Sequence, residues 1–241
     1  MIYEKYKKMN CISSNMRNAV YSGKEISTKN IVIIKNYMVT SSYHREKAML
    51  NIVNKLDDHS EYVQMIESSD EENIIIFEFI STIDLYEAIT KELFTLEEKI
   101  KIMIHISKAI EKLHNIDIIY RDIKAENIMV DPKTLKIKII DFDSSGLISD
   151  SEFCTTYNYG TYDYLDPMSN RATFATDVYA LGVLFYEIMS DKIYRRNHDR
   201  NIISQLETIE NKNIQNLISK MLFLKKKLRP KIGRASCRER V

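Results

Sequence analysis

The sequence predicts an α+β fold, with strands in the first third of the chain and helices in most of the rest. Two strands joined by a turn and then a third strand are predicted within residues 11–35, and further strands at residues 62–67, 73–79, 128–130 and 135–139. Helices are predicted at residues 43–56, 96–115, 176–188 and 214–221. The strands are short and rich in β-branched residues, whereas the helices carry apolar residues at intervals of three and four.

Length and composition limit the possible classes of protein. The chain has 241 residues, 44% of them hydrophobic, which is enough for one large domain or two small lobes. A formal net charge of +1 argues against nucleic-acid binding as the main activity. The first ten residues lack the apolar core of a secretory signal, and the longest apolar stretch, residues 179–189, is too short to span a membrane. Three scattered cysteines favour a reducing, cytoplasmic location, which is the host cytoplasm if the source is a virus or parasite.

Each predicted element rests on a local pattern. Residues 31–35 form a short β-branched run, and Leu135, Ile137 and Ile139 alternate with lysines as in a half-buried strand. Ser41 or Ser42 is expected to cap the first long helix. That helix and the second have apolar stripes, formed by Met49, Ile52, Val53 and Leu56 and by Met103, Ile106, Ile110 and Leu113.

A polar run between apolar residues at 119–130 carries the first chemical signal. Asp122 can orient a hydroxyl proton, and Lys124 can reach a phosphate. Asn127 can ligate a metal whose other ligand comes from elsewhere. By itself the run also fits an ordinary charged loop. Asp141, directly after the strand at 135–139, supplies a second candidate metal ligand.

The runs Tyr-Arg-Asp-x-Lys-x-x-Asn and Asp-Phe-Asp resemble the catalytic and metal-binding motifs of eukaryotic-type Ser/Thr protein kinases. Gly160-Thr161-x-x-Tyr164-x-x-Pro167 resembles the element that binds the acceptor peptide in that family. The resemblance covers about residues 11–230. It implies a bilobal fold with ATP between the lobes: a small β-rich lobe with one main helix at 1–80 and a larger, mostly helical lobe at 81–230. Residues 231–241 turn arginine-rich and are expected to be a non-native tail or a short basic surface tail, without the last helices of a typical kinase.

The resemblance assigns the chemical roles. Asp122 and Lys124 become the catalytic residues, and Asn127 and Asp141 hold two Mg²⁺, with Mn²⁺ as a possible replacement. Lys35 holds the α- and β-phosphates and pairs with Glu46, although a surface lysine and an exposed helical glutamate are the common fates of such residues.

The remaining cofactor contacts surround the adenosine. The resemblance places Val20 and Ile33 against the adenine and Met129 below it. The backbone of Glu78 and Ile80 meets the adenine edge. Asp84 matches the residue that bonds the ribose, and it equally fits a helix N-cap.

Three departures from the family pattern are visible. The phosphate-covering loop has Ser13, Asn15 and Asn18 in place of glycines and is expected to hold phosphate less closely. Asp143 replaces the glycine of the metal-binding motif. Met168 replaces the glutamate that pairs with an arginine near the end of the domain, so Arg229 is expected to lack its partner.

The predicted function is transfer of the ATP γ-phosphate to Ser or Thr hydroxyls of a protein substrate. The alternative is a pseudokinase that binds nucleotide or acts as a scaffold, and a third reading is a small-molecule kinase of related fold. An unmodified loop after Asp143 is the default expectation. A phosphate added at Thr155, Thr156 or Tyr157 would find a cation in Arg121.

Overall fold

The computed structural model describes residues 2–151, 160–196 and 202–232. The chain divides into two compact units, which are described separately. Unit 1 contains residues 1–81 and 140–144, and unit 2 contains residues 82–139 and 145–241. The short segment 140–144 therefore belongs with unit 1, although it lies far from the rest of that unit in the sequence.

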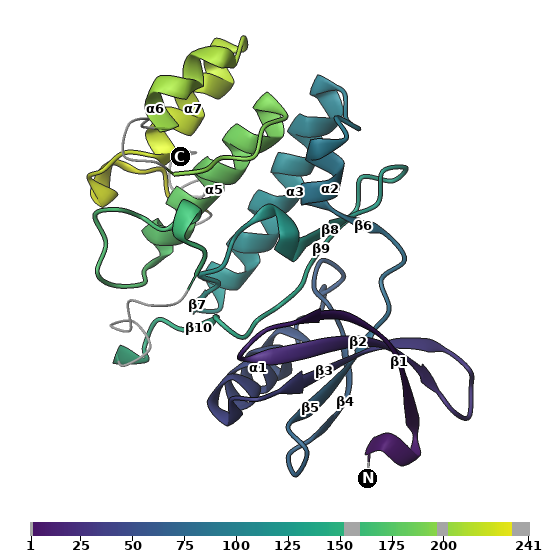
Figure 1. Cartoon of the computed structure of the whole chain (residues 1–241). Coiled ribbons are helices and arrows are strands. Elements are labelled where there is room, and N and C mark those ends of the chain that lie inside the picture. Colours follow the sequence, from purple (N-terminus) through teal and green to yellow (C-terminus); the bar gives the residue numbers. More distant parts are fainter. Residues whose placement is uncertain (1, 152–159, 197–201, 233–241) are drawn as a thin grey trace. The chain divides into compact units, whose positions relative to one another are not determined.

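Unit 1 is an antiparallel five-stranded sheet with one long helix (Figure 1). The strand order is β1-β2-β3-β5-β4. The strands are β1 (Tyr6–Ser14), β2 (Asn18–Glu25), β3 (Ile31–Tyr37), β4 (Met65–Ser69) and β5 (Ile74–Glu78). The helix is α1 (Thr40–Val53), and a short 3₁₀ turn, η1 (Ile2–Glu4), precedes the sheet.

Side-chain alternation in β3 separates the two faces of this sheet. Val32 and Ile34 join a buried apolar cluster on one face, together with Ile2, Tyr6, Ile74 and Ile76. Lys35 and Tyr37 have the opposite parity, and both are buried against Glu46 of α1. The sequence pattern thus places a charged side chain on the face that the helix covers.

The predicted cap of α1 is wrong. The helix begins at Thr40, so Ser41 and Ser42 already lie inside its first turn, and Val39 occupies the cap position without a side-chain hydrogen bond. The physical reason is the short connection, because β3 extends to Tyr37 and leaves only two residues before the helix.

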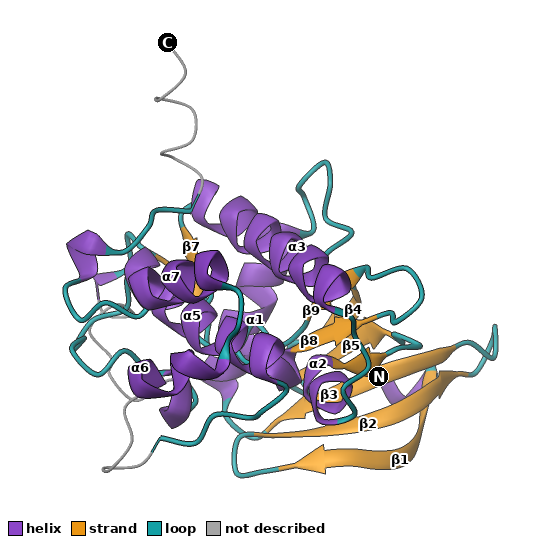
Figure 2. Cartoon of the chain, turned by 90° about the horizontal axis from the view of Figure 1, so that it is seen from above, coloured by secondary structure: helices purple, strands orange, loops and turns teal. Residues whose placement is uncertain are grey.

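Unit 2 is mostly helical (Figure 2). Its longer helices are α2 (Leu85–Thr90), α3 (Leu96–Asn115), α5 (Phe174–Ser190) and α7 (Lys212–Met221), with the short α6 (Ile202–Gln205). Its strands are β6 (Ile83–Asp84), β7 (Ile118–Ile119), β8 (Ile128–Val130), β9 (Ile137–Ile139) and β10 (Gly146–Leu147). The 3₁₀ turns are η2 (Ala125–Asn127), η3 (Tyr162–Tyr164), η4 (Leu206–Thr208) and η5 (Lys226–Leu228).

Helix α5 is the centre of unit 2. It is buried along most of its length and contacts α3 and α7. Helix α3 starts at a capping box, in which Thr95 and Glu98 satisfy each other's backbone N–H groups. Among the described residues, none of the helices has the length and apolarity needed to cross a membrane.

Arg229 has a partner, contrary to the sequence prediction. Its Nη1 lies 2.6 Å from Oδ2 of Asp166, and both side chains are almost fully buried. Nη1 also donates to the carbonyl of Ala175, and Nε donates to the carbonyl of Phe223. Asp166 stands two residues before Met168, so its carboxylate replaces the one that is missing at position 168.

Arg229→Met should destabilise the protein by about 3–5 kcal/mol, because it leaves the Asp166 carboxylate buried without its partner. Urea unfolding monitored by circular dichroism measures the loss. Lys101→Met, which removes an exposed ion pair with Glu97, is the matched control and should leave the midpoint nearly unchanged. Equal midpoints for the two variants would contradict a stabilising role for the buried pair.

Candidate functional site

In unit 1 the candidate residues converge on the Lys35 ammonium. Its Nζ lies 2.8 Å from Oε2 of Glu46 and 2.8 Å from Oδ1 of Asp141. Oε1 of Glu46 accepts a hydrogen bond from the backbone N–H of Phe142 at 3.0 Å. The strand, the helix and the segment 140–144 are therefore joined through one buried carboxylate.

Burial and neighbouring charge oppose each other at this cluster. Burial acts to lower the pKa of Lys35, but the carboxylates of Asp141 and Glu46 outweigh it, so the net pKa lies above the ordinary value. Burial raises the pKa of Glu46 to about 7, and the Lys35 ammonium works against that rise. The ammonium thus stays charged at neutral pH and can neutralise an anion.

Asp143 adds a third carboxylate to this cluster. Ligand atoms of Glu46, Asp141 and Asp143 lie within 4.8 Å of one another. Carboxylate oxygens are the ligands that Mg²⁺ prefers, so the residues present fit a divalent metal. The Asp141 side chain is 31% exposed, whereas that of Glu46 is 1% exposed, which makes Asp141 the accessible ligand.

Two of the predicted adenine contacts of unit 1, Val20 and Ile33, share a sheet face with Lys35. Val20 of β2 is paired with Lys35, and Ile33 of β3 is paired with Phe77 of β5. Directly opposed residues of antiparallel strands point to the same side, so these side chains line one surface. Glu78 ends β5, where its backbone N–H donates to Gln64, and Ile80 follows as a half-buried residue.

The glycine-free loop is a closed hairpin. Oδ1 of Asn15 accepts the backbone N–H groups of Arg17 and Asn18 at 2.7 and 3.0 Å, and the N–H of Asn15 donates to the carbonyl of Asn18. None of residues 13–18 has a positive φ. The side-chain amide of Asn15 thus closes a turn at which the family pattern has glycines.

In unit 2 the catalytic-loop candidates form one hydrogen-bonded group around Asp122. Nδ2 of Asn127 donates to the carbonyl and to Oδ2 of Asp122, at 2.9 and 2.8 Å. Lys124 lies 2.9 Å from the same carboxylate. The hydroxyl of Thr161 donates to Oδ1 of Asp122 at 2.9 Å and accepts from Lys124 at 3.1 Å. Since Asn127 bonds through nitrogen, its side-chain oxygen remains the atom that fits a metal.

Asp177 of α5 fixes the backbone of this loop. Its Oδ2 accepts from the N–H of Tyr120 and its Oδ1 from the N–H of Arg121, both at 2.9 Å. His114 Nε2 lies 2.9 Å from Oδ2. The carboxylate is 1% exposed, so these contacts compensate its desolvation.

Asp84 and Met129 also belong to unit 2. They face each other across β6 and β8. The Asp84 carboxylate accepts the N–H of Glu87 at 2.7 Å and therefore caps α2, as one of the two predictions for this residue requires. Its proposed contact with ribose remains a prediction.

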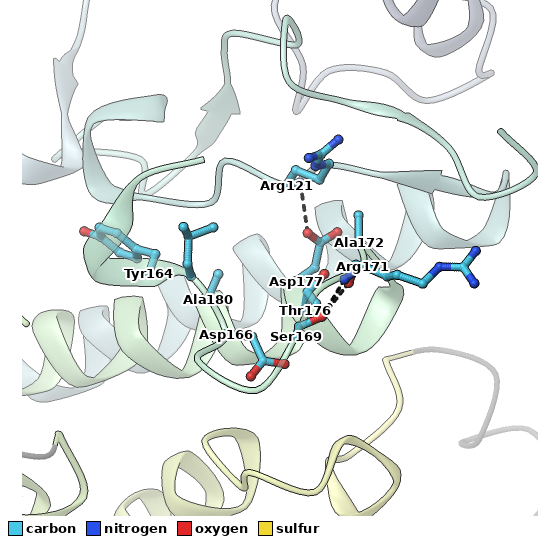
Figure 3. A pocket seen from close by; sticks show the side chains of 10 residues that line it. Arg121, Tyr164, Asp166, Ser169, Arg171, Ala172, Thr176, Asp177 and Ala180 are labelled. Atoms are coloured by element: carbon cyan, nitrogen blue, oxygen red, sulfur yellow. Dashed lines mark hydrogen bonds between the residues drawn. The ribbon is translucent and has the colours of Figure 1, made fainter. Parts of the chain in front are cut away.

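A small pocket in unit 2 lies beside Asp177 (Figure 3). Arg121 and Arg171 are among its lining residues, and the Arg171 side chain extends away from Asp177 in this view. The candidate phosphorylation sites Thr155, Thr156 and Tyr157 lie outside the described residues.

Three contacts of the site were not predicted from the sequence. The Tyr37 hydroxyl bonds to Glu46, His114 supports Asp177, and Thr161 bonds to Asp122. The strand alternation places Tyr37 on the same face as Lys35, and this signal could have revealed it. His114 gave no comparable signal, because its contact joins residues 63 positions apart.

Comparison with known proteins identifies a family. The protein kinase domain matches residues 7–238. A putative ribosomal protein S6 kinase alpha-1 of Caenorhabditis elegans is 35% identical over 131 residues, which is 53% of this chain and 17% of the relative. The LRR receptor-like serine/threonine-protein kinase FEI 2 of Arabidopsis thaliana is 36% identical over 129 residues, 50% of this chain and 22% of the relative. The matches thus span about a fifth of the relatives' length, and they confirm the predicted family and fold class.

Glu187 makes the stability of unit 2 depend on pH. It is buried in α5, where it accepts hydrogen bonds from the Tyr164 hydroxyl at 2.6 Å and from the Tyr194 N–H at 2.9 Å. Burial raises its pKa from 4.5 to about 8. The folded protein therefore binds this proton more tightly than the unfolded chain does, and the contribution to stability is lost as pH rises from 4.5 to about 8.

Glu187→Gln should reduce the loss of stability with rising pH, because the neutral amide has no charge to bury. Thermal unfolding between pH 5 and about 8.5 measures it, over the range set by the raised pKa. The variant should gain stability relative to the wild type as pH rises. Glu97→Gln, on the exposed side of α3, is the control and should follow the wild-type curve. Parallel curves for wild type and Glu187→Gln would disprove the assignment.

Proposed function

The chain belongs to the protein kinase domain family, and from this premise we propose that it transfers the γ-phosphate of ATP to Ser or Thr hydroxyls of proteins. Protein kinases in general use ATP, a divalent metal and protein substrates. The choice of Ser and Thr as acceptors rests on Lys124 and Thr161, and it agrees with the similarity to FEI 2, a serine/threonine-protein kinase. We also propose that residues 1–80 and 81–230 act as the two lobes.

The observation that carries the proposal is the environment of Asp122. Thr161, Lys124 and Asn127 hold its carboxylate in one orientation through contacts of 2.8–2.9 Å. A carboxylate fixed in this way can orient an acceptor hydroxyl and accept its proton. The neighbouring Lys124 ammonium can neutralise charge that develops on the transferring phosphate.

Unit 1 supplies the complementary part of the reaction. Lys35 would hold the α- and β-phosphates, because its ammonium is charged, and Glu46 orients it. Val20, Ile33 and the backbone of Glu78 and Ile80 would contact the adenine, with Met129 and Asp84 of unit 2 meeting the base and the ribose.

Asp141 and Asn127 would hold two divalent metal ions, which when bound neutralise phosphate charge. We propose Mg²⁺, since carboxylate and amide oxygens suit it, with Mn²⁺ as a substitute. Catalysis then consists mainly of positioning and charge neutralisation.

A pseudokinase is the second candidate. Asp143, in place of glycine, adds negative charge beside Asp141 and Glu46, which is the observation that favours it. The complete set of Lys35, Glu46, Asp122 and the metal ligands favours turnover, because binding alone does not require the group around Asp122.

Asp122→Asn should lower phosphate transfer by about a hundredfold or more, since it removes the carboxylate that accepts the proton. Phosphate transfer is measured with labelled ATP, Mg²⁺ or Mn²⁺, and basic, acidic and proline-directed test substrates. Asp131→Asn, in an exposed turn, is the control and should retain wild-type transfer.

Absence of transfer by the wild type, together with thermal stabilisation by ATP, would contradict the enzyme and favour the pseudokinase. Transfer that is equal in wild type and Asp122→Asn would indicate a contaminating kinase and would also overturn the assignment.

A further inference from the structure

We propose that Tyr37 is a positioning residue, which holds Glu46 through its hydroxyl while Lys35 engages the nucleotide. The proposal deepens the proposed function and rests on it. All the contacts that support it lie within unit 1.

The contact itself is short and shielded from water. The Tyr37 hydroxyl donates to Oε2 of Glu46 at 2.6 Å, and the exposed fractions of the two residues are 5% and 1%. Hydrogen bonds to a charged acceptor are stronger than neutral ones, and burial removes the competition of water.

Tyr37 shares its acceptor with Lys35. Both residues lie on one face of β3, two positions apart, and both donate to Oε2, while Phe142 donates to Oε1. Of the three donors, the Lys35 ammonium is also bonded to Asp141 and sits on a flexible stem. The Tyr37 ring has few rotatable bonds and is packed edge-on against Tyr43.

This difference gives Tyr37 a specific task. When the Lys35 ammonium turns toward phosphates, Glu46 loses part of the charge that compensates its burial. Tyr37 continues to donate to the carboxylate and keeps α1 attached to the end of β3. The short connection between Tyr37 and Thr40 makes this possible, because the last strand residue reaches Glu46 in the second turn of the helix.

Tyr37→Phe tests the proposal without changing the ring. Amide hydrogen exchange of the segment 140–144 in nucleotide-free protein should become faster, because Phe142 donates to the carboxylate that is no longer fixed. The KM for ATP should rise and kcat/KM should fall roughly tenfold, the effect of losing about one hydrogen bond to a charged group.

Tyr43→Phe is the matched control. It removes the hydroxyl from the neighbouring tyrosine, which bonds to Asp70 and not to Glu46, so exchange at 140–144 and the ATP kinetics should stay at wild-type values. A melting temperature close to that of the wild type in both variants shows that the fold is kept.

A double-mutant cycle with Glu46→Gln tests whether Tyr37 acts through Glu46. Adding Tyr37→Phe to Glu46→Gln should cause little further loss, whereas independent roles would give additive losses and overturn the proposal. Unchanged exchange in Tyr37→Phe would also overturn it. If the wild type transfers no phosphate but Tyr37→Phe still exchanges faster at 140–144, the positioning contact is supported and the proposed function is contradicted.

Discussion

Burial of a carboxylate is the constraint on which both units depend. Glu46 in unit 1 and Asp177 in unit 2 are each 1% exposed, and a buried charge is costly unless donors surround it. The Glu46 carboxylate accepts hydrogen bonds from Lys35, Tyr37 and the N–H of Phe142. The Asp177 carboxylate contacts His114 and accepts hydrogen bonds from the N–H groups of Tyr120 and Arg121. In each unit a helix thus presents one carboxylate that fixes a distant, chemically important segment.

The same contacts hold strained backbone in place. Arg121 has a φ of 69° and Asp141 a φ of 65°, values that non-glycine residues seldom adopt. The N–H of Arg121 donates to Asp177, and the N–H after Asp141 donates to Glu46. Surrounding structure must over-determine such conformations, and the two carboxylates supply that support. They thereby couple the orientation of the proposed metal ligand, and of the loop that carries the proposed catalytic residues, to the core of each unit.

The sequence predicted the main elements because their patterns are local. The apolar stripe of α3 and the motif at Asp122 each involve residues that are close together in the sequence, so they can be recognised without knowledge of the tertiary structure. The contacts that were missed are decided by tertiary geometry. The cap predicted at Ser41 or Ser42 is wrong because β3 extends to Tyr37 and the helix begins at Thr40. Arg229 was predicted to lack a partner because the family motif has its carboxylate at position 168, whereas here Asp166 supplies it. Residue type alone does not reveal which carboxylate reaches a buried arginine.

The lost glycines bear on whether this kinase domain retains activity. Asn15, Asn18 and Asp143 stand where the family has glycine, yet none of the three has a positive φ among the described residues. Their side chains therefore cost no left-handed strain, and those of Asn15 and Asp143 accept local hydrogen bonds. Gly160, which remains, has a φ of 115°, and an added Cβ would lie 3.0 Å from the carbonyl oxygen of Arg121. The side chains at positions 15, 18 and 143 thus add no left-handed backbone strain, so backbone strain lends no support to the pseudokinase, whose case rests on the negative charge of Asp143 beside Asp141 and Glu46.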